Sequence, residues 1–444
     1  MRIAFITAGA AGMFCGSCMR DNTLVTALRR RGHDALLIPT YTPIRTDEAD
    51  VSQARVFFGG INVYLQEKFW LFRHTPWLAD RLLDVPRLLR WVSRFAGRMR
   101  YSELGGITIS MLQGRHGRQR KEVAKLADWL AAEVKPDVVI FSNALLSGVV
   151  PALRERVTAP VWVTLQGDDI FLDALPPAER AACADLIRKN TAGIAGFLST
   201  SRFYADHMSD YLGIPREKVR VVYPGLNLDG HAGARPARRE GRLAVGYFAR
   251  VCPEKGFHHA VEGFIAMMTA PDAPDVVLRA SGWLGPNDKA FYHNQLAKLA
   301  AAGLADRFEY VETPTHADKV RFFQSVDVLC VPTTYREPKG LYVLEAWANG
   351  LPVVLPAHGS FPELMDAAGG GLLVPPGDIP VLAATLRRAL EDHDLRDAAG
   401  RAGEAAVRDR FTADAMARET EMVLEEGRTN YPDPRPEPEV TRAP

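Results

Sequence analysis

Two glutamates, Glu337 and Glu345, flank a glycine in the strongest chemical motif of the sequence. A buried strand is expected just before this motif, and a helix is expected to begin near Gly340 and to end at Gly350. The N–H groups of Gly340 and Leu341 then point out of a helix N-terminus, where phosphate oxygens bind readily. Carboxylates on both sides of such a site suit the hydroxyls of sugars joined to a diphosphate. The same spacing also fits an acidic loop followed by a glutamate on a helix surface.

Two cations, Arg250 and Lys255, follow another expected strand. They lie where that strand ends and the next helix begins, which is the edge where open α/β sheets bind ligands. A guanidinium and an ammonium at this edge can neutralise a leaving diphosphate. Taken singly, each is more commonly a solvated surface charge.

A glycine-rich loop near the start contains Gly9, Gly12 and Gly16, whose spacing does not match a dinucleotide-binding fingerprint. Gly12 and Gly16 would let the backbone approach a ligand closely. The same loop carries Cys15 and Cys18, spaced as a redox pair or as half of a zinc site. The chain has no second cysteine pair to complete four zinc ligands, so a packed or cleft-lining pair is the first interpretation and a redox pair the second.

Short β-branched runs alternate with longer helical patterns along the chain, which indicates parallel sheets covered by helices on both faces. The pattern restarts half-way, so we expect two Rossmann-like doubly wound domains of the α/β class that face a cleft. The expected strands cover 3–7, 35–39, 138–141, 161–165, 196–200 and 219–223 in the first half, and 243–247, 276–280, 308–311, 328–331 and 353–355 in the second.

Composition shifts set the expected domain boundaries. We expect a first domain over 1–228, a linker over 229–241, a second domain over 242–405, a helix over 406–427 that can cross back to the first domain, and a disordered tail over 428–444. The stretch 57–101 is rich in aromatic residues and arginine at helical spacing. It predicts a basic amphipathic insertion that either covers the first sheet or lies on an anionic membrane.

Charge and composition exclude several classes of protein. Lys plus Arg is 54 and Asp plus Glu is 53, so the net charge of +1 leaves no footprint for nucleic acid. Five cysteines are too few for a disulfide framework and favour a reducing compartment. No apolar run reaches the ~18 residues of a membrane-spanning helix. Because the first fifteen residues do not fit a signal peptide, we expect a cytoplasmic protein, with peripheral contact at the inner membrane face as an option.

Together these motifs resemble the retaining family-4 glycosyltransferases, which have the two-domain GT-B fold. The family's two glutamates with seven residues between them match Glu337 and Glu345, and its Arg-x4-Lys element matches Arg250 and Lys255. The segment that closes the family's first domain is similar to residues 222–229. The family's later glycine-rich loops are similar to residues 358–363 and 371–378. The likeness covers about 2–40 and 135–415.

The resemblance implies a role for each matched residue. Glu345 would bind the ribose of the donor and Glu337 the hydroxyls of the donor sugar. The diphosphate would be held by Arg250, Lys255 and the Gly340 and Leu341 amides, with the loop of Gly12 and Gly16 facing the donor across the cleft. No cofactor is implied, and no metal, because two cations and a helix N-terminus already supply positive charge. The Asp-x-Asp pattern at 392–394 is interpreted as surface.

Two positions depart from the family pattern. Gln166 stands where the family usually has a histidine near the reacting sugar, and glutamine cannot take a proton. Any acid or base role there moves to Asp168 or Asp169, and these three residues are candidate sugar or acceptor contacts. Lys339 replaces an aromatic residue before the helix glycine, either as a further phosphate contact or as a loop charge without a role.

The resulting prediction is transfer of a hexosyl group from a nucleoside-diphosphate sugar to a glycan, a lipid-linked molecule or a small molecule, with retention of configuration. The resemblance places such an enzyme in cell-envelope polysaccharide or glycolipid synthesis. Three alternatives stay open. One is an enzyme of the same fold that isomerises a nucleotide sugar or uses a sugar phosphate. Another is an NAD(P)-dependent oxidoreductase, against which the absent Gly-x-Gly-x-x-Gly counts. The third is a nucleotide-sugar-binding protein without transferase activity, which Gln166 keeps open.

Overall fold

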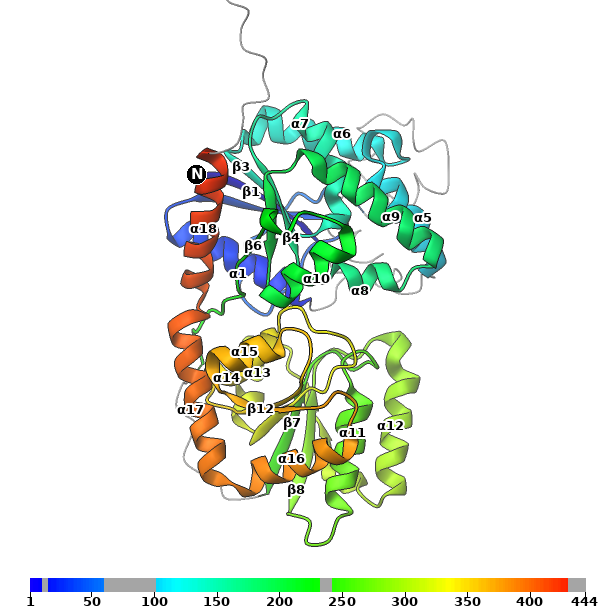
Figure 1. Ribbon diagram of the computed structural model, residues 1–444, viewed down its shortest axis with the longest axis vertical. Coiled ribbons are helices and arrows are strands. Elements are labelled where there is room, and N and C mark those ends of the chain that lie inside the picture. Colours follow the sequence, from blue (N-terminus) through cyan, green and yellow to red (C-terminus); the bar gives the residue numbers. More distant parts are fainter. Residues whose placement is uncertain (10–14, 60–100, 232–241, 430–444) are drawn as a thin grey trace, which may run out of the picture.

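Two α/β domains, each built on a six-stranded parallel sheet, lie one above the other in the computed structural model (Figure 1), which describes residues 1–9, 15–59, 101–231 and 242–429. The first sheet has the order β2-β1-β3-β4-β5-β6. Its strands are β1 (Arg2–Ala8), β2 (Asp34–Thr40), β3 (Val138–Phe141), β4 (Val161–Leu165), β5 (Gly196–Ser199) and β6 (Val219–Val221).

The first sheet is buried on both faces because its strands are apolar on both sides. In β1, Ile3 and Phe5 point into one core while Ala4 and Ile6 point into another, as the two-residue repeat of a strand requires. Helices therefore cover both faces. They are α1 (Gly16–Arg30), α5 (Tyr101–Leu112), α6 (Arg120–Trp129), α7 (Val150–Arg154), α8 (Asp168–Asp173), α9 (Pro177–Asn190) and α10 (Arg202–Leu212).

The second sheet has the order β12-β11-β10-β7-β8-β9, which is the doubly wound arrangement. Its strands are β7 (Leu243–Phe248), β8 (Val276–Ser281), β9 (Phe308–Tyr310), β10 (Val328–Cys330), β11 (Val353–Pro356) and β12 (Gly371–Val374). The covering helices are α11 (Phe257–Met268), α12 (Lys289–Ala301), α13 (His316–Gln324), α14 (Leu341–Ala348), α15 (Phe361–Ala368), α16 (Ile379–Glu391) and α17 (His393–Arg410).

The direction of chain progression reverses once in each sheet, and this fixes where a ligand can bind. In the second sheet the reversal falls between β7 and β10, and in the first between β1 and β3. Crevices open outside the carboxyl ends of strands at such points. Arg250 and Lys255 follow β7 and Glu337 follows β10, so the sheet order brings these three predicted residues to one crevice.

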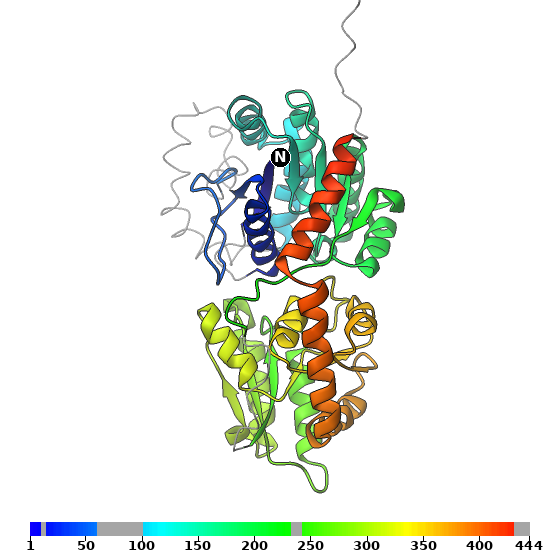
Figure 2. The same ribbon diagram turned by 90° about the vertical axis from the view of Figure 1, so that its left-hand side faces the viewer.

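The C-terminal part of the chain has two helices where the sequence predicted one over 406–427. α17 packs on α14 of the second domain, and α18 (Ala413–Thr429) packs on α1 of the first. Figure 2 shows the two helices following one another along one side of the molecule. The break falls where Leu226, on its way into the second domain, pairs with Thr412 on its way back. The helix ends here because Leu226 bonds to the backbone of Phe411 and Ala413 (2.8 and 2.7 Å).

Two more segments differ from their sequence interpretation. Phe57 and Phe58, the first residues of the expected insertion, are fully buried in a core of the first domain. The segment from Gly371 was interpreted as part of a glycine-rich loop but begins with β12, an edge strand beside β11. The predictions for the rest of the insertion (60–100), for most of the linker (232–241), for Gly12 and for the tail (430–444) lie outside the described residues.

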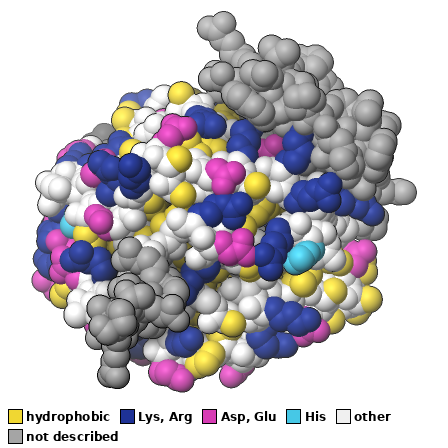
Figure 3. All heavy atoms as spheres, turned by 90° about the horizontal axis from the view of Figure 1, so that it is seen from above, with side chains coloured by type: hydrophobic (Ala, Val, Ile, Leu, Met, Phe, Trp, Pro, Cys, Tyr) yellow, Lys and Arg dark blue, Asp and Glu magenta, His cyan; other side chains and the backbone are white. Residues whose placement is uncertain are grey.

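The described part of one face of the molecule carries charges of both signs (Figure 3). Seen from above, basic and acidic side chains are interspersed over the described face (Figure 3). None of the helices within the described ranges is long and apolar enough to cross a lipid bilayer.

Candidate functional site

Glu337 is the centre of a buried hydrogen-bond network in the crevice of the second domain. Its Oε2 atom accepts hydrogen bonds from Lys255 Nζ (2.6 Å), Tyr335 Oη (2.7 Å) and Tyr342 Oη (3.1 Å), and its Oε1 atom accepts one from the Gly340 N–H (3.4 Å). Burial raises the pKa of a carboxyl, but the Lys255 ammonium and the Tyr335 hydroxyl outweigh it and bring the pKa of Glu337 down to about 2. This carboxylate is therefore charged at neutral pH.

The loop between β10 and α14 holds Glu337 in place through its own backbone. The Ser360 N–H donates to the Glu337 carbonyl oxygen (2.8 Å). Gly359 lies so close that a Cβ atom there would be 2.6 Å from the Glu337 nitrogen. The turn ends at Gly340, whose φ of 63° is the left-handed conformation that glycine adopts without strain. α14 begins directly after it, and its first turn presents N–H groups that lack an intrahelical acceptor.

Arg250 and Lys255 lie on a tight turn between β7 and α11. The Tyr247 hydroxyl fixes this turn by donating to the carbonyl oxygens of Arg250 (2.9 Å) and Lys255 (3.4 Å). The turn packs against the loop after β10, since a Cβ atom on Gly256 would lie 1.7 Å from the Pro332 carbonyl oxygen. Lys255 points into the network of Glu337, whereas the Arg250 side chain is 42% exposed and contacts Cys252 Sγ (3.2 Å) and the Glu254 carboxylate (3.7 Å).

Glu345 lies one turn further along α14, in a second charged cluster. Its Oε1 atom accepts a hydrogen bond from Lys319 Nζ (2.6 Å), and the same ammonium bonds to Asp47 of the first domain (2.5 Å). His316 Nδ1 is 3.6 Å from the Asp47 carboxylate. Burial raises the pKa of Asp47, but His316 and Lys319 outweigh it and leave the pKa below its ordinary value. The cluster links the two domains through charge.

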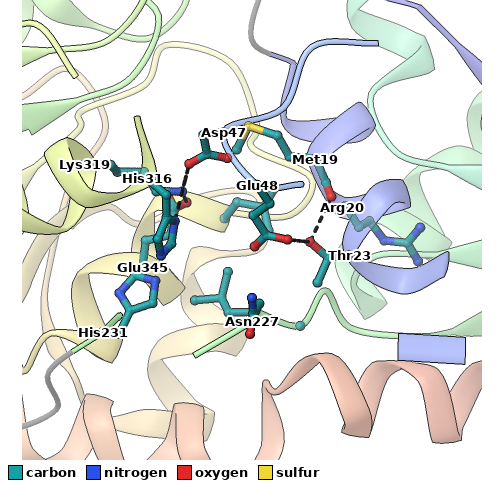
Figure 4. Close-up of a pocket in the computed structure, with 13 residues that line it drawn as sticks. Met19, Arg20, Thr23, Asp47, Glu48, Asn227, His231, His316, Lys319 and Glu345 are labelled. Atoms are coloured by element: carbon teal, nitrogen blue, oxygen red, sulfur yellow. Dashed lines mark hydrogen bonds and ion pairs between the residues drawn. The ribbon is translucent and has the colours of Figure 1, made fainter. Parts of the chain in front are cut away.

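A pocket opens between the domains at this cluster (Figure 4). The pocket is narrow and merges with solvent, and about 340 Å³ is its space counted together with the adjoining open solvent. The first domain contributes Thr23, Asp47 and Glu48 to the lining, and the second contributes His316, Lys319 and Glu345. The carboxylate expected to bind a ribose therefore faces a pocket with polar walls from both domains.

The first domain meets the start of α14 through α1 and the loop after β4. A Cβ atom on Gly16 would lie 3.4 Å from Leu341 Cδ1 and 3.5 Å from Lys339 Cε, which are ordinary van der Waals distances, so this contact does not require a glycine. Lys339 Nζ donates to Ser17 Oγ (2.7 Å) and to the Gln166 carbonyl oxygen (3.0 Å). Burial lowers the pKa of Lys339. Lys339 thus bridges the domains.

The three polar residues predicted after β4, Gln166, Asp168 and Asp169, have different hydrogen-bond partners. Gln166 donates from its amide to the Ser142 carbonyl oxygen (2.9 Å) and to Asp21 Oδ1 (3.3 Å). Both oxygens of Asp168 accept backbone N–H groups, from Ala144 (2.6 Å) and Gln166 (3.0 Å), so Asp168 clamps two loops together. Burial raises the pKa of Asp168 to about 6.

Asp169 is occupied by side chains of α10. It accepts a hydrogen bond from the Tyr204 hydroxyl (2.6 Å), and its other oxygen is 3.1 Å from His207 Nε2. The structure therefore keeps Gln166 near the domain contact and ties both aspartates into the loop and helix around it.

Sequence reasoning missed several residues of the site. Lys319, Asp47 and Asp21 are buried or nearly buried charges whose partners lie far away in sequence. Tyr335 and Tyr342 lie two residues before and five residues after Glu337 in the sequence. This short spacing was the signal from which their hydrogen bonds to Glu337 could have been predicted.

Two family models match the chain, one on each domain. The model of the glycosyl transferase 4-like domain matches residues 22–225, and that of the glycosyl transferases group 1 matches residues 234–406. The chain belongs to the group 1 glycosyltransferases. Together with the two doubly wound domains, this assigns the GT-B fold and agrees with the resemblance seen in the sequence.

Curated relatives of this glycosyltransferase family match part of the chain. A D-inositol 3-phosphate glycosyltransferase of Mycobacterium marinum is 32% identical over 198 residues, which is 42% of this chain and 39% of the relative. A 2-deoxystreptamine glucosyltransferase of Streptomyces kanamyceticus is 28% identical over 228 residues, covering 49% and 57% of the two chains. The chain thus spans about half the length of the curated relatives it matches.

Solved glycosyltransferase structures share the whole fold. HepE of Anabaena, in complex with UDP and glucose, has a TM-score of 0.66 at 17% identity and covers 95% of this chain and 99% of its own. Sucrose-phosphate synthase of Thermosynechococcus elongatus has a TM-score of 0.68 at 18% identity, covering 96% and 99%.

Proposed function

We propose that this protein transfers a hexosyl group from a nucleoside-diphosphate sugar to an acceptor hydroxyl, with retention of configuration. The observation that carries the proposal is the Glu337–Lys255 pair at 2.6 Å, placed at the reversal point of the second sheet beside the N-terminus of α14. A carboxylate, an ammonium and helix N–H groups at one crevice suit a sugar joined to a diphosphate.

The arrangement suggests how the donor is held. The diphosphate would lie over the first turn of α14, between Arg250 and Lys255. Its nucleoside would extend into the pocket lined by Glu345, and its sugar would reach Glu337. Because Lys319 already holds one oxygen of Glu345, the carboxylate is fixed in direction before the ribose arrives.

The chemistry follows from the charges on the two sides of the bond that breaks. When the bond from the anomeric carbon to the diphosphate oxygen breaks, negative charge grows on the diphosphate, and Arg250, Lys255 and the helix N-terminus stabilise it. Gln166 cannot accept the proton of the incoming hydroxyl, and both Asp168 oxygens already accept N–H groups. We assign this proton to an oxygen of the departing diphosphate, which would bring acceptor and leaving group to the same face and retain configuration.

The proposal includes no metal ion, because the positive charge that the diphosphate needs is supplied by the chain. A chelator such as EDTA is therefore expected to leave donor turnover unchanged. Restoration of lost turnover by Mg²⁺ or Mn²⁺ would contradict this part of the proposal.

The ligands bound in similar structures guide the choice of substrates to test. HepE was solved with UDP and with UDP-glucose, so UDP-hexoses are the first donors to try. The relatives are named for acceptors as different as an inositol phosphate and an aminocyclitol, so the acceptor class stays open.

Sedimentation with anionic vesicles at low and high salt tests a lipid-linked acceptor and peripheral membrane contact. Binding that ignores lipid charge would reject the membrane contact.

The decisive experiment is thermal stabilisation by UDP, GDP, ADP and NAD in the wild type, Arg250→Ala and the control Arg242→Ala. Arg242 is half-exposed and pairs with Asp275, away from the crevice. We expect one nucleoside diphosphate to raise the Tm of the wild type and the control, and the rise to be lost in Arg250→Ala. Stabilisation by NAD alone, or by none of the four, would overturn the proposal.

A further inference from the structure

Cys15 and Cys18 lie together at the N-terminus of α1, where the first domain meets the second. Cys15 is the N-cap residue of this 15-residue helix, with φ of −118° and ψ of 122°, and Cys18 belongs to its first turn. The Cys18 thiol donates a hydrogen bond to the Ala8 carbonyl oxygen (3.2 Å), and Cys18 is also the largest influence on the pKa of Cys15. Residues three apart at the start of a helix lie on one face, so the two thiols are neighbours there.

The surroundings favour a thiolate on Cys15. The first turn of α1 contains no acidic residue, and the amides of a helix N-terminus stabilise negative charge. Lys339 of the second domain bonds to Ser17, which lies between the two cysteines. The hydrogen bond from Cys18 lowers the pKa of Cys15 and Lys339 adds to this, whereas burial opposes it. The pKa of Cys18 is raised by the same hydrogen bond and by burial.

The other cysteines have none of these features. Cys183, Cys252 and Cys330 are buried, and burial raises the pKa of each thiol. All five cysteines lie in the described residues, and among them only Cys15 is partly exposed. Of these five thiols, Cys15 is therefore the one that a reagent from solution reaches first.

We propose that Cys15 and Cys18 form a redox-active dithiol at the domain contact, which a low-molecular-weight disulfide such as oxidised glutathione converts to an intramolecular disulfide. The Cys15 thiolate attacks one sulfur of the oxidant and releases the other half as a thiolate. Cys18 then loses its proton to solvent, and its sulfur attacks the Cys15 sulfur and expels the second half. The two thiols are oxidised, and one disulfide is reduced to two thiols.

The contact with Lys339 couples this reaction to the domain contact. In the reduced protein the Lys339 ammonium faces the Cys15 thiolate, whereas after oxidation its bonded partners, Ser17 Oγ and the Gln166 carbonyl oxygen, are neutral. A thiolate that the second domain stabilises must in turn stabilise the contact with that domain. The reduced pair thus favours the closed arrangement. This inference stands apart from the proposed transferase activity.

Disulfide formation between Cys15 and Cys18 can be measured in buffers with an increasing ratio of oxidised to reduced glutathione. After equilibration the protein is quenched in acid, alkylated and analysed by mass spectrometry. We expect the wild type and the control Cys183→Ser to lose two hydrogens and to yield a peptide linked through Cys15 and Cys18. The Cys15→Ser and Cys18→Ser variants, checked for folding by their Tm, should not. A lasting glutathione adduct on Cys15, a link to another cysteine, or a metal ion retained by the reduced pair would each overturn the proposal.

The rate of alkylation by iodoacetamide as a function of pH tests the coupling to Lys339. In Lys339→Met we expect the reaction of Cys15 at neutral pH to slow by about tenfold for each pKa unit regained. The control Lys298→Met removes a surface lysine paired with Glu262 and should keep the wild-type profile. An unchanged profile in Lys339→Met would overturn the coupling while leaving the disulfide test intact.

Discussion

Glu337 accepts more hydrogen bonds from its own protein than a sugar contact needs. Three side-chain donors and one backbone N–H converge on it, and two of the donors, Lys255 and Tyr335, are themselves bonded to each other. The carboxylate therefore orders the cation that would face the diphosphate. Removing either charge of such a buried pair leaves the other uncompensated, which is costly. Glutamine also removes the charge, but it keeps the shape and one oxygen acceptor for the tyrosine hydroxyls, so it disturbs the network less than truncation.

We expect Glu337→Gln to lower donor turnover by about 10²–10³-fold, as loss of a preorganised polar group at a reacting centre commonly does. Nucleoside diphosphate binding should weaken less than turnover, because Arg250 and the N-terminus of α14 remain in place while Lys255 loses its carboxylate partner. Donor hydrolysis and thermal stabilisation by UDP measure the two effects. Glu309→Gln, at a surface pair with Arg279, serves as control. Near-normal turnover in Glu337→Gln would reject the assigned role.

The sequence predicted the residues of the second-domain crevice because their geometry is local. Glu337, Gly340 and Glu345 share one loop and one helix, so their spacing fixes their placement. Lys319 and Asp47 complete the cluster of Glu345 from another helix and another domain, and no pattern in a single sequence reports such contacts. The acid or base role considered for two aspartates after β4 rested on proximity in sequence, whereas the structure uses both as hydrogen-bond acceptors within the fold.

At the scale of single elements, the start of α14 depends on a glycine. Gly340 has φ of 63°, and a Cβ atom there would lie 3.1 Å from Leu364 Cδ1. A left-handed non-glycine residue costs about 1–2 kcal/mol. A shift of this turn also moves the N–H groups proposed to hold the diphosphate.

Gly340→Ala is therefore expected to lose unfolding free energy of about 1–2 kcal/mol and also to weaken UDP binding. Gly377→Ala is the matched control, because Gly377 has φ of 76° and nothing within 4 Å of an added Cβ atom. Both variants should lower the free energy of unfolding in denaturant, but only Gly340→Ala should raise the Kd for UDP. Equal Kd values in the two variants would count against a diphosphate at this helix.

α18 belongs to the core of the first domain, although it comes last in the chain. Leu424 is fully buried against that domain, whereas Met422 on the same helix is 57% exposed. Leu424→Ala should cost about 2–5 kcal/mol of unfolding free energy, and Met422→Ala less than about 0.5 kcal/mol. Denaturant unfolding of the two variants measures both. Equal midpoints would show that α18 does not pack as described.

Which elements the sequence predicts depends on how deeply they are buried. The strands in the middle of each sheet contact helices on both faces, so they appear as short apolar runs. β12 was missed because it starts with the last of three consecutive glycines, which is typical of a loop, whereas β9, an edge strand that is no less exposed, was predicted. The break between α17 and α18 was also missed, since it is imposed by pairing with Leu226 and not by a helix-breaking residue.

For the whole molecule, the domains are held closed by polar contacts around one loop. The Thr200 and Ser201 hydroxyls donate to the Pro338 carbonyl oxygen (3.0 and 2.8 Å), and Lys339 reaches across to α1. On the other side of the crevice, Asp47 meets Lys319. Contacts of this kind are weaker than an apolar interface and allow domain movement.

The Asp47 contact gives the closed state a pH dependence whose sign is fixed. Asp47 raises the pKa of His316 above its ordinary value, against the effect of burial. The resulting stability is complete below the unfolded pKa of about 6.5 and is lost as pH rises through the folded pKa. The lowered pKa of Asp47 adds stability above about pH 4 that is lost in acid.

We therefore expect the difference in unfolding free energy between the wild type and Asp47→Asn to shrink as the pH rises from about 6 to about 8. The comparison uses the difference because other histidines, such as His231 with its lowered pKa, change the total stability with the opposite sign. The Tm of this variant should be lowered more at the acidic end of the range than at the alkaline end. Asp306→Asn, an exposed residue next to Arg307, should keep the wild-type profile. Parallel profiles for the wild type and Asp47→Asn would show that this contact does not form in solution.

The return of α18 to the first domain also sets the order in which the molecule is completed during synthesis. Val423 and Leu424 fill a core whose other walls are α1, β1 and β3. The ribosome synthesises α1, β1 and β3 first, and it synthesises α18, which packs on them, only after the entire second domain. Until α18 has been synthesised, the apolar face beside α1 is exposed to solvent. Exposed apolar surface of this kind makes nascent chains prone to aggregate. The first domain is therefore synthesised first but completes its core last, and the second domain can fold before it.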